Sequence, residues 1–263
     1  MDRVVTESVE IIPGAADAGA LFICDHASNA VPPELGDLGL PATQFARHIA
    51  FDIGAADLTR SLAAAFGAPA VLSRFSRLVI DPNRGADDPT LVMRLSDGAI
   101  IPGNACADAA EIERRRLLYW RPYRAAVAAL IAEMTAARPI PAIISMHSFT
   151  PVWKTCPRPW DIAVLWDEDS RIAAPLMASL RADGFVVGDN EPYDGALEGD
   201  TLYDLATIPG LAHVLIEARQ DLVATPAAAS AFAARVAHAL RPVLAMQEAH
   251  IIRPHGSRAG RRP

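Results

Sequence analysis

Lysine is almost absent from this chain of 263 residues, in which Lys154 stands alone beside 23 arginines. A lysine that forms a Schiff base, or one that binds phosphate in a P-loop, would therefore have to be Lys154. The P-loop motif GxxxxGK[ST] and the nucleophile elbow GxSxG are also missing, and no GxGxxG follows a predicted strand. These absences argue against P-loop enzymes, α/β-hydrolases and dinucleotide-binding enzymes.

Paired cysteines and long apolar runs are missing as well. The three cysteines are far apart and form no CxxC pair, which indicates a reducing compartment. The first ten residues, MDRVVTESVE, carry acidic side chains where a signal peptide has its apolar core. No uncharged apolar run reaches the roughly 18 residues of a membrane helix. We therefore expect a cytoplasmic protein that does not enter a membrane.

Basic charge is scarce and unevenly placed. The chain carries 24 basic and 31 acidic residues, a net charge of −7. Four arginines lie in the last 13 residues without an acid among them, so residues 1–250 hold 20 basic against 31 acidic residues. Such an acidic body is a poor nucleic-acid binder, because phosphate binding needs a basic face. We expect a single domain over 1–250 and a basic, disordered tail over 251–263.

Short apolar runs alternate with helical patterns along the chain. The runs are continuous, as in strands that are buried on both faces. Strands that alternate with helices favour a three-layer α/β/α domain with a largely parallel or mixed central sheet. Residues 81–107, rich in Pro, Gly, Asp and Asn, are expected to form a long loop near the site. The predicted strands are Leu21–Cys24, Ala70–Ser73, Leu78–Ile80, Ala142–Met146, Ile162–Trp166, Phe185–Val187 and Val214–Ile216, and the predicted helices are 43–66, 108–137, 169–183 and 226–249.

Polar side chains follow four of the predicted strands directly. Because ligands of open α/β sheets bind at the carboxyl ends of the strands, these side chains are expected to meet at one edge. They include two histidines and several carboxylates, which are the usual ligands of a catalytic Zn²⁺. The segments are Asp25-His26, Asp81-Pro-Asn-Arg84, His147-Ser148 and Glu217-Ala-Arg219.

Each candidate also has an ordinary structural interpretation. His26 alone could equally cap a turn, and His147 alone would more often be a packed core histidine. Together at two strand ends, they favour a metal site. Asp52 follows His48 by four residues on the predicted helix 43–66, so the two would share one face. That pair is either a solvated polar pair or part of the ligand set, and both alternatives stay open.

The candidates at the other two strand ends are a buried acid and several arginines. Glu217 would be either buried with a partner or poised as a base. Arg219 lies two residues further along the strand and could be that partner. Asn83-Arg84 could be a plain turn or a carboxylate clamp, since arginine presents a bidentate fork. Arg77 could assist the clamp or pair with Asp81.

Several segments together resemble the N-formylglutamate amidohydrolase family. They occur in the family's order between about residues 20 and 222, and the second is the most specific. The resemblance implies a metal-dependent amidohydrolase that converts N-formyl-L-glutamate to L-glutamate and formate, as in histidine degradation. The segments are His26-Ala-Ser-Asn-Ala-Val-Pro32, Ser76-Arg-Leu-Val-Ile-Asp-Pro-Asn-Arg84, Glu111-Ile-Glu-Arg-Arg115, Tyr119-Trp-Arg-Pro-Tyr123 and Met146-His-Ser148.

The pattern is more distantly similar to zinc carboxypeptidases and aspartoacylase, whose fold we therefore expect. By that similarity His26 and His147 hold Zn²⁺ or another divalent transition metal. The third position after His26 is Asn29 where the pattern has Glu. The resemblance implies Asp52 as the third ligand, because members of the family carry an Asp in the corresponding helix. Glu217 is expected to activate water, with Arg219 beside it as a second catalytic residue. Substrate contacts are expected from Arg77, Asn83, Arg84, Ser148 and Asn29.

The substrate itself stays open at this point. The segment 96–107 lacks an Asp-Gly-Glu-Pro stretch that the resemblance would place there. The same chemistry on another N-acyl amino acid or a short peptide is therefore an alternative, as is a non-catalytic metal-binding protein on the same fold. In each case the expected partner is a small anion, and the sequence indicates no oligomeric state.

Overall fold

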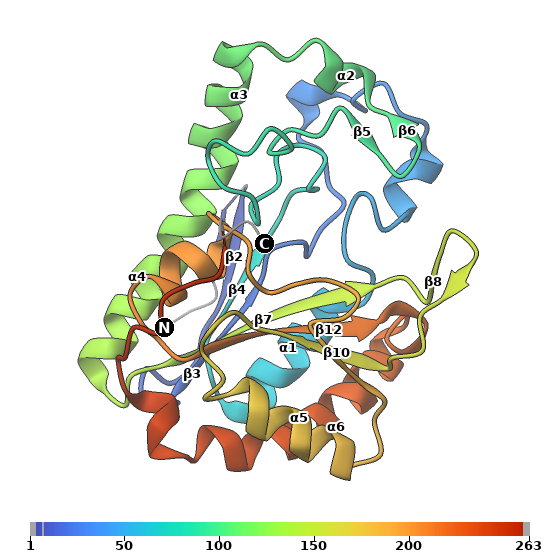
Figure 1. The fold of residues 1–263 in the computed structure, drawn as a ribbon. Coiled ribbons are helices and arrows are strands. Elements are labelled where there is room, and N and C mark those ends of the chain that lie inside the picture. The colour runs from blue at the N-terminus through green and yellow to red at the C-terminus, as the bar shows by residue number, and fades with distance from the viewer. Residues whose placement is uncertain (1–3, 7, 260–263) are drawn as a thin grey trace.

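The computed structural model describes residues 4–6 and 8–259 and is built on a mixed eight-stranded sheet (Figure 1). The strand order is β1-β2-β4-β3-β7-β12-β10-β11. The four central strands β4, β3, β7 and β12 run parallel, while β2 and β10 are antiparallel to their central neighbours. The strands are β1 (Val4–Val5), β2 (Val9–Ile12), β3 (Ala20–Cys24), β4 (Ala70–Ser73), β7 (Ala142–Phe149), β10 (Ile162–Leu165), β11 (Val187–Asp189) and β12 (His213–Arg219).

Helices cover both faces of the sheet. One face packs on α1 (Ala55–Phe66), α5 (Ala173–Ala182) and α6 (Pro226–Leu244), and the other packs on α4 (Arg121–Ala137). Successive strand residues alternate between two buried cores, as Phe22 and Ile23 do in β3. This burial on both faces explains why the strands read as continuous apolar runs. The expected three-layer α/β/α fold with a mixed sheet is confirmed.

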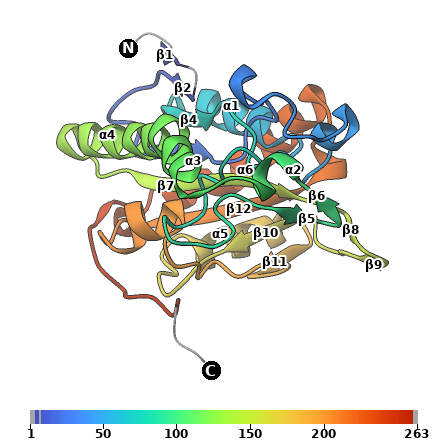
Figure 2. The same ribbon diagram turned by 90° about the horizontal axis from the view of Figure 1, so that it is seen from above.

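Smaller elements lie around this core, and Figure 2 looks down on α2, α3 and the β5–β6 hairpin. Two short hairpins are β5–β6 (Leu95–Ser96 with Ala99–Ile100) and β8–β9 (Val152–Trp153 with Cys156–Pro157). A π-helical turn, η3, joins α3 to α4 just before Pro122. The remaining elements are η1 (Pro33–Leu35), η2 (Ala42–Ala46), α2 (Pro102–Ala105), α3 (Ala109–Arg115), η3 (Arg116–Trp120), η4 (Tyr203–Thr207), η5 (Gln220–Leu222) and η6 (Gln247–His250).

Two predicted elements were wrong in ways that matter for the site. Leu78–Ile80 is a buried turn rather than a strand, because its amides bond locally: Leu78 N–H donates to Ser76 Oγ (3.1 Å) and Val79 N–H to the Ser76 carbonyl (2.9 Å). The predicted helix 43–66 begins only at Ala55. Residues 42–46 form the short η2 turn, and 47–54 form a loop that contains Asp52.

The tail packs against the body of the protein as far as the structure describes it. Arg258 donates from its backbone N–H to Asp167 Oδ1 (2.9 Å) and from Nη2 to the Trp166 carbonyl (2.8 Å), and it pairs with Asp194. Residues 251–259 of the predicted tail are among the described residues, whereas Arg261 and Arg262 lie outside them. None of the described helices is long and apolar enough to cross a membrane.

Candidate metal centre and active-site cavity

A cavity of about 390 Å³ lies over the carboxyl ends of the central strands. Its walls come from the turns after β3 and β7, from segment 77–84, from β10 and β12, and from loop 193–200. These segments are far apart in the sequence and meet because the parallel strands end at the same edge.

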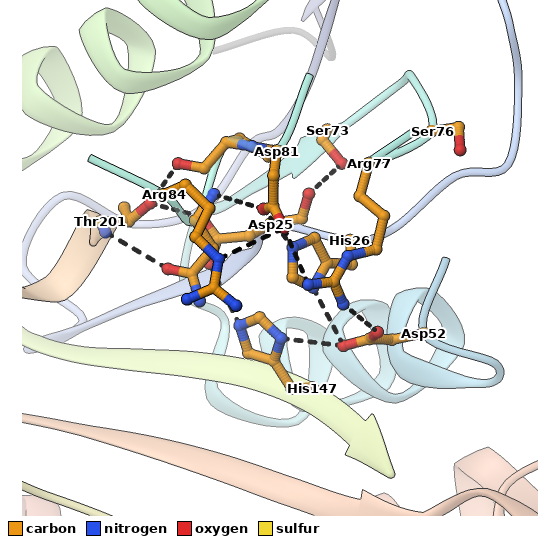
Figure 3. Close-up of polar contacts among 12 residues, drawn as sticks. Asp25, His26, Asp52, Ser73, Ser76, Arg77, Asp81, Arg84, His147 and Thr201 are labelled. Atoms are coloured by element: carbon orange, nitrogen blue, oxygen red, sulfur yellow. Dashed lines mark hydrogen bonds and ion pairs between the residues drawn. The ribbon is translucent and has the colours of Figure 1, made fainter. Parts of the chain in front are cut away.

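His26, Asp52 and His147 converge at the bottom of this cavity, with their side chains turned toward one another (Figure 3). Asp52 Oδ2 lies 3.3 Å from His26 Nδ1 and 2.8 Å from His147 Nδ1. The two imidazole rings meet edge to face, with their centroids 4.9 Å apart. All three side chains are buried.

A second set of carboxylates lies behind the two imidazoles. His26 Nε2 is 2.7 Å from Asp81 Oδ1, and His147 Nε2 is 3.2 Å from Asp25 Oδ2. Both acids are completely buried. Asp25 also accepts hydrogen bonds from the hydroxyls of Thr201 (2.6 Å) and Ser145 (3.2 Å). This ring of acceptors fixes both imidazole planes.

The charges of this cluster stabilise one another. Burial by itself lowers the pKa of His147, but hydrogen bonds and charge from Asp25 and Asp52 raise that pKa well above its usual value. Burial raises the pKa of Asp52, but the nearby His26 and His147 bring it below its ordinary range. The imidazoles and the carboxylates of this cluster thus each favour the charged form of the other.

The donor set fits a divalent metal ion. One ligand atom each from His26, Asp52 and His147 lies within 4.8 Å of the others. Metal-ligating histidines usually give their second ring nitrogen to a carboxylate, and Asp81 and Asp25 occupy that place here. Imidazole nitrogen and carboxylate oxygen also suit Zn²⁺ and its neighbours in the first transition row.

Asp52 reaches the cluster through the loop that precedes α1. Its backbone N–H donates to the His26 carbonyl (3.0 Å), while the Ala50 carbonyl accepts from Ser76 Oγ (2.8 Å). Gly54 then turns the chain into the helix with φ of +81°. A Cβ there would lie 2.1 Å from the Val223 carbonyl oxygen, so only glycine fits.

Glu217 lies beside His147, because the two residues are direct partners in the parallel pairing of β12 with β7. Its side chain lines the cavity, yet Oε2 is buried without a hydrogen-bond partner. Burial, with a smaller contribution from Asp52, raises the pKa of this carboxyl group to about 7, although His147, His26 and Arg77 act in the opposite direction. An unsatisfied buried carboxyl group next to a histidine is suited to proton transfer.

Two arginines line the cavity, and their guanidinium groups differ in how many contacts they make with nearby carboxylates. Arg77 is bound to the cluster, with Nη2 2.8 Å from Asp81 Oδ2 and Nη1 3.6 Å from Asp52 Oδ1. The guanidinium of Arg84 makes no hydrogen bond to any described side chain or carbonyl, and its Nε is 4.0 Å from Asp81 Oδ2. Arg84 is therefore the guanidinium that is available to a ligand.

Asn83 and Ser148 also lie on the cavity wall, as the sequence predicts. Ser148 donates from its backbone N–H to Asp52 Oδ2 (3.4 Å) and from Oγ to the Ile53 carbonyl (2.8 Å), so it helps to hold the Asp52 loop. Asn83 accepts a hydrogen bond from Thr201 N–H (3.3 Å).

Two predicted site residues do not reach the cavity. The Asn29 amide donates outward to the Phe45 carbonyl (2.8 Å). Arg219 bonds to Asp221 Oδ1 (2.8 Å) and the Trp160 carbonyl (3.2 Å), and lies 3.5 Å from Asp161. Asp221, which follows β12, and Asp161, which precedes β10, hold its side chain, so a shared strand face does not bring it to Glu217. We therefore place both residues outside the site.

Other side chains belong to the site although the sequence analysis gave them no individual role. Asp25 and Asp81 each follow an apolar run directly, and that position was the available signal. Tyr193, Asp200 and Gln220 also line the cavity, but nothing in their local sequence points to a site. His48 lines the cavity too, yet it pairs with Asp97 (3.5 Å) and shares no helix with Asp52.

The comparisons with known proteins agree with this fold. A gene product of Agrobacterium tumefaciens of known crystal structure is 36% identical, covers 91% of this chain and 95% of its own, and superposes with a TM-score of 0.86. N-formylglutamate amidohydrolase from Ralstonia eutropha JMP134 is 19% identical, and the match covers 90% of this chain and 97% of that protein. Its TM-score of 0.68 shows that the two share a fold. No curated protein sequence matches this chain.

The family comparison is the most direct. Residues 18–224 match the family described as N-formylglutamate amidohydrolase. That range includes the His26, Asp52 and His147 cluster, as well as Glu217. The chain therefore belongs to the N-formylglutamate amidohydrolase family.

Proposed function

We propose that the protein is a metal-dependent hydrolase of the amide bond in N-acyl amino acids, with N-formyl-L-glutamate as the reference substrate. The observation that carries the proposal is the convergence of His26, Asp52 and His147 next to the unpartnered Glu217. Membership of an amidohydrolase family supports the reaction type.

A divalent ion would be held by His26, Asp52 and His147. When bound, it would supply Lewis-acid polarisation of the amide carbonyl, together with acidification of water. The protein's contribution is to fix the three donors in advance. Asp81 and Asp25 orient the two imidazoles, and Ser148 orients the Asp52 carboxylate.

Glu217 is the proposed general base and acid. Its Oε2 has no hydrogen bond within the described protein, so it is free to accept a proton from the attacking water. The same carboxyl group can then deliver that proton to the nitrogen of the leaving amine. Its position next to His147 is set by the pairing of β12 with β7 rather than by a loop.

Arg84 is the proposed carboxylate clamp, with Asn83 beside it. Arginine presents a planar fork that matches a carboxylate, and the Arg84 guanidinium makes no hydrogen bond to a described protein group, with only the 4.0 Å contact to Asp81. Arg77 instead holds Asp52 and Asp81, so we assign it to positioning of the cluster.

A cytoplasmic location and a role in histidine degradation remain expectations that belong to this proposal. They rest on the unpaired cysteines and on the resemblance to the family.

The test is metal content combined with formate release. The purified protein should contain about one divalent ion per chain and release formate from N-formyl-L-glutamate, or an amine from another N-acyl amino acid. A chelator should abolish this activity, and the removed metal should restore it. His147→Ala should lose both metal and activity, while His238→Ala on the exposed side of α6 should keep both.

Two outcomes would contradict the proposal. Full hydrolysis by chelated, metal-free protein would exclude metal dependence. Stoichiometric bound metal without hydrolysis of any N-acyl amino acid would favour the non-catalytic metal-binding alternative.

A further inference from the structure

The segment Tyr119-Trp-Arg-Pro-Tyr123 lies wholly among the described residues, and none of its side chains lines the cavity. It spans the junction of the π-helical turn η3 with α4, and Arg124 follows it directly. Trp120 and Arg124 are four residues apart, a spacing that places two side chains on one face of a helix. The guanidinium of Arg124 lies over the Trp120 ring, 4.3 Å from its centroid. The two side chains therefore form one packed pair.

This pair binds the main chain of residues 82–84, the clamp segment. Trp120 Nε1–H donates to the Arg84 carbonyl (3.0 Å). Arg124 Nε–H donates to the Pro82 carbonyl (3.3 Å). The backbone N–H of Arg84 also donates, to the carbonyl three residues back (3.2 Å). The backbone of Arg84 is thus bonded at both its N–H and its carbonyl, whereas its guanidinium makes no hydrogen bond to a described protein group.

Arg124 also connects the clamp segment to loop 193–200, which forms another wall of the cavity. Its Nη2 donates to the Gly199 carbonyl (2.7 Å), and its Nη1 pairs with Asp204. Gly199 has a φ of +75°, and a Cβ there would lie only 2.8 Å from Gly85 Cα, so the loop and the clamp segment pack closely. One buried guanidinium therefore fixes these two walls relative to each other.

The π-helical turn sets which side chains of this segment reach the clamp. The backbone N–H of Arg121 donates to the carbonyl five residues back. The turn therefore holds one more residue than a turn of α-helix, which rotates the side chains before it relative to those after it. Tyr119 and Tyr123 are buried in the core, while Trp120 and Arg124 reach the clamp segment. Single π turns within α-helices often occur at functional sites.

We infer that Trp120 and Arg124 are positioning residues for Arg84, which fix the main chain of the clamp segment so that the guanidinium is in place before a carboxylate binds. A side chain that is held at its base loses less freedom on binding, and the difference appears as affinity. Neither residue belongs to the metal cluster, so the chemical step should depend on them much less. As an account of affinity, this inference rests on the proposed function; as an account of the clamp segment, it stands by itself.

Trp120→Phe removes one N–H and keeps an aromatic ring beside Arg124. We expect the Kd of N-formyl-L-glutamate for metal-free protein, measured by titration calorimetry, to rise about 3- to 10-fold. In metal-loaded protein KM should rise by the same factor, while kcat changes less than about twofold. Trp166→Phe is the matched control, because its indole N–H donates to Asp189 (2.7 Å) and its side chain lies outside the cavity. Unchanged Kd and KM in Trp120→Phe would overturn the inference.

Combination with Arg84→Gln separates positioning from a general loss of structure. If Trp120 acts through Arg84, its effect disappears once that guanidinium is gone. Trp120→Phe should therefore change Kd and KM less than about twofold in the Arg84→Gln background. The same factor in both backgrounds would overturn the inference, because it would show that Trp120 acts independently of Arg84.

Arg124→Lys keeps the charge beside Asp204 but offers a single ammonium group to two carbonyls. We expect Kd to rise at least about fivefold, and again only when Arg84 is present. Arg121→Lys is the matched control on the same helix, since the Arg121 guanidinium binds Glu113 (2.8 Å) on the exposed side. Equal effects of the two variants would contradict a specific role of Arg124.

Hydrogen exchange tests the clamp segment without a ligand. In metal-free protein, Trp120→Phe and Arg124→Lys should speed exchange in the peptide that contains Asn83 and Arg84 at least about fivefold, and Trp166→Phe should leave it unchanged. Unchanged exchange in the first two variants would overturn the inference. If the parent protein neither binds nor hydrolyses N-formyl-L-glutamate, the proposed function fails, and hydrogen exchange still decides whether the pair holds the clamp segment.

Discussion

The two parts of the site differ in what holds them. His147 and Glu217 are direct partners in neighbouring parallel strands, Glu217 is also paired with Ala163 of β10, and His26 follows a third strand by two residues. Asp52, Arg84 and residues 193–200 lie on loops that depend on a few side-chain and backbone contacts. The groups proposed to perform the chemistry are thus placed mostly by the sheet, and those proposed to select the ligand mostly by loops.

The sheet-borne part should show the largest effect. Glu217→Gln removes the proposed proton acceptor and keeps the side-chain volume, so kcat should fall at least about 100-fold while bound metal and the melting temperature stay nearly unchanged. Steady-state kinetics, elemental analysis and thermal unfolding measure the three quantities. Near-normal turnover with metal bound would show that Glu217 is not the base.

A substitution at Arg84 tests the part of the site that lies on loops, through its effect on substrate affinity. Arg84→Gln removes a charge-assisted contact, so KM should rise about 10- to 100-fold with a smaller change in kcat. Arg219→Gln is the matched variant, because its guanidinium is bound to Asp221 and Asp161 away from the cavity. A rise in KM for Arg219→Gln instead of Arg84→Gln would reverse our placement of these two residues.

Asp200 tests whether a buried carboxyl group on the loop makes the stability of the protein depend on pH. Burial, helped by Asp25, raises the pKa of this carboxyl group to about 7, although Tyr203 N–H, Arg124 and His147 act in the opposite direction. A raised pKa means that the folded state holds the proton more tightly, so stability is lost as pH rises from about 4 to about 7. Asp200→Asn can still accept the bond from Tyr203 N–H.

The stabilisation by Asp200→Asn should therefore be larger at pH 8 than at pH 5, by about 1–2 kcal/mol. Denaturant unfolding of metal-free protein at both pH values measures the difference between variant and parent. The same gain at both pH values would mean that Asp200 does not titrate in this range.

The tail should show the smallest effect. Arg258 links Asp194 of the cavity loop to the carbonyl of Trp166 at the end of β10. Arg258→Ala should lower stability by about 1 kcal/mol or less and raise KM a few-fold, since the pair is partly exposed. Arg253→Ala, whose partner Glu248 lies away from the cavity, should leave KM unchanged. Identical KM values for both variants would mean that the contact of Arg258 with Asp194 does not position the cavity loop for substrate binding.

The strand-end residues were predictable because of local sequence order. A continuous apolar run predicts a buried strand, and the parallel topology then brings the carboxyl ends of β3, β7 and β12 to one edge. His26, His147 and Glu217 were expected on this basis, and the structure brings them together. Asp25 and Asp81 carried the same signal, but the sequence analysis gave them no individual role.

The loops were less predictable because their positions depend on contacts that are remote in sequence. Asp52 was expected at the site by resemblance, yet on a helix that in fact starts three residues later. Its place depends on the His26 carbonyl and on Ser148, 26 and 96 residues away. Arg219 was misplaced because the prediction considered only its spacing of two residues from Glu217 along the strand. It did not consider the acids Asp221 and Asp161, which bind the guanidinium.

By itself, the sequence determined the α/β layers, the polar residues that stand at the carboxyl ends of the strands, and the shortage of lysine. These features depend on local pattern and composition. The tertiary structure alone decided which carboxylates surround the imidazoles and which of the two cavity arginines is held by the cluster. The physical reason is that an apolar strand and the polar residues at its end are neighbours in the sequence. The pairing of buried charges instead depends on which distant segments pack together.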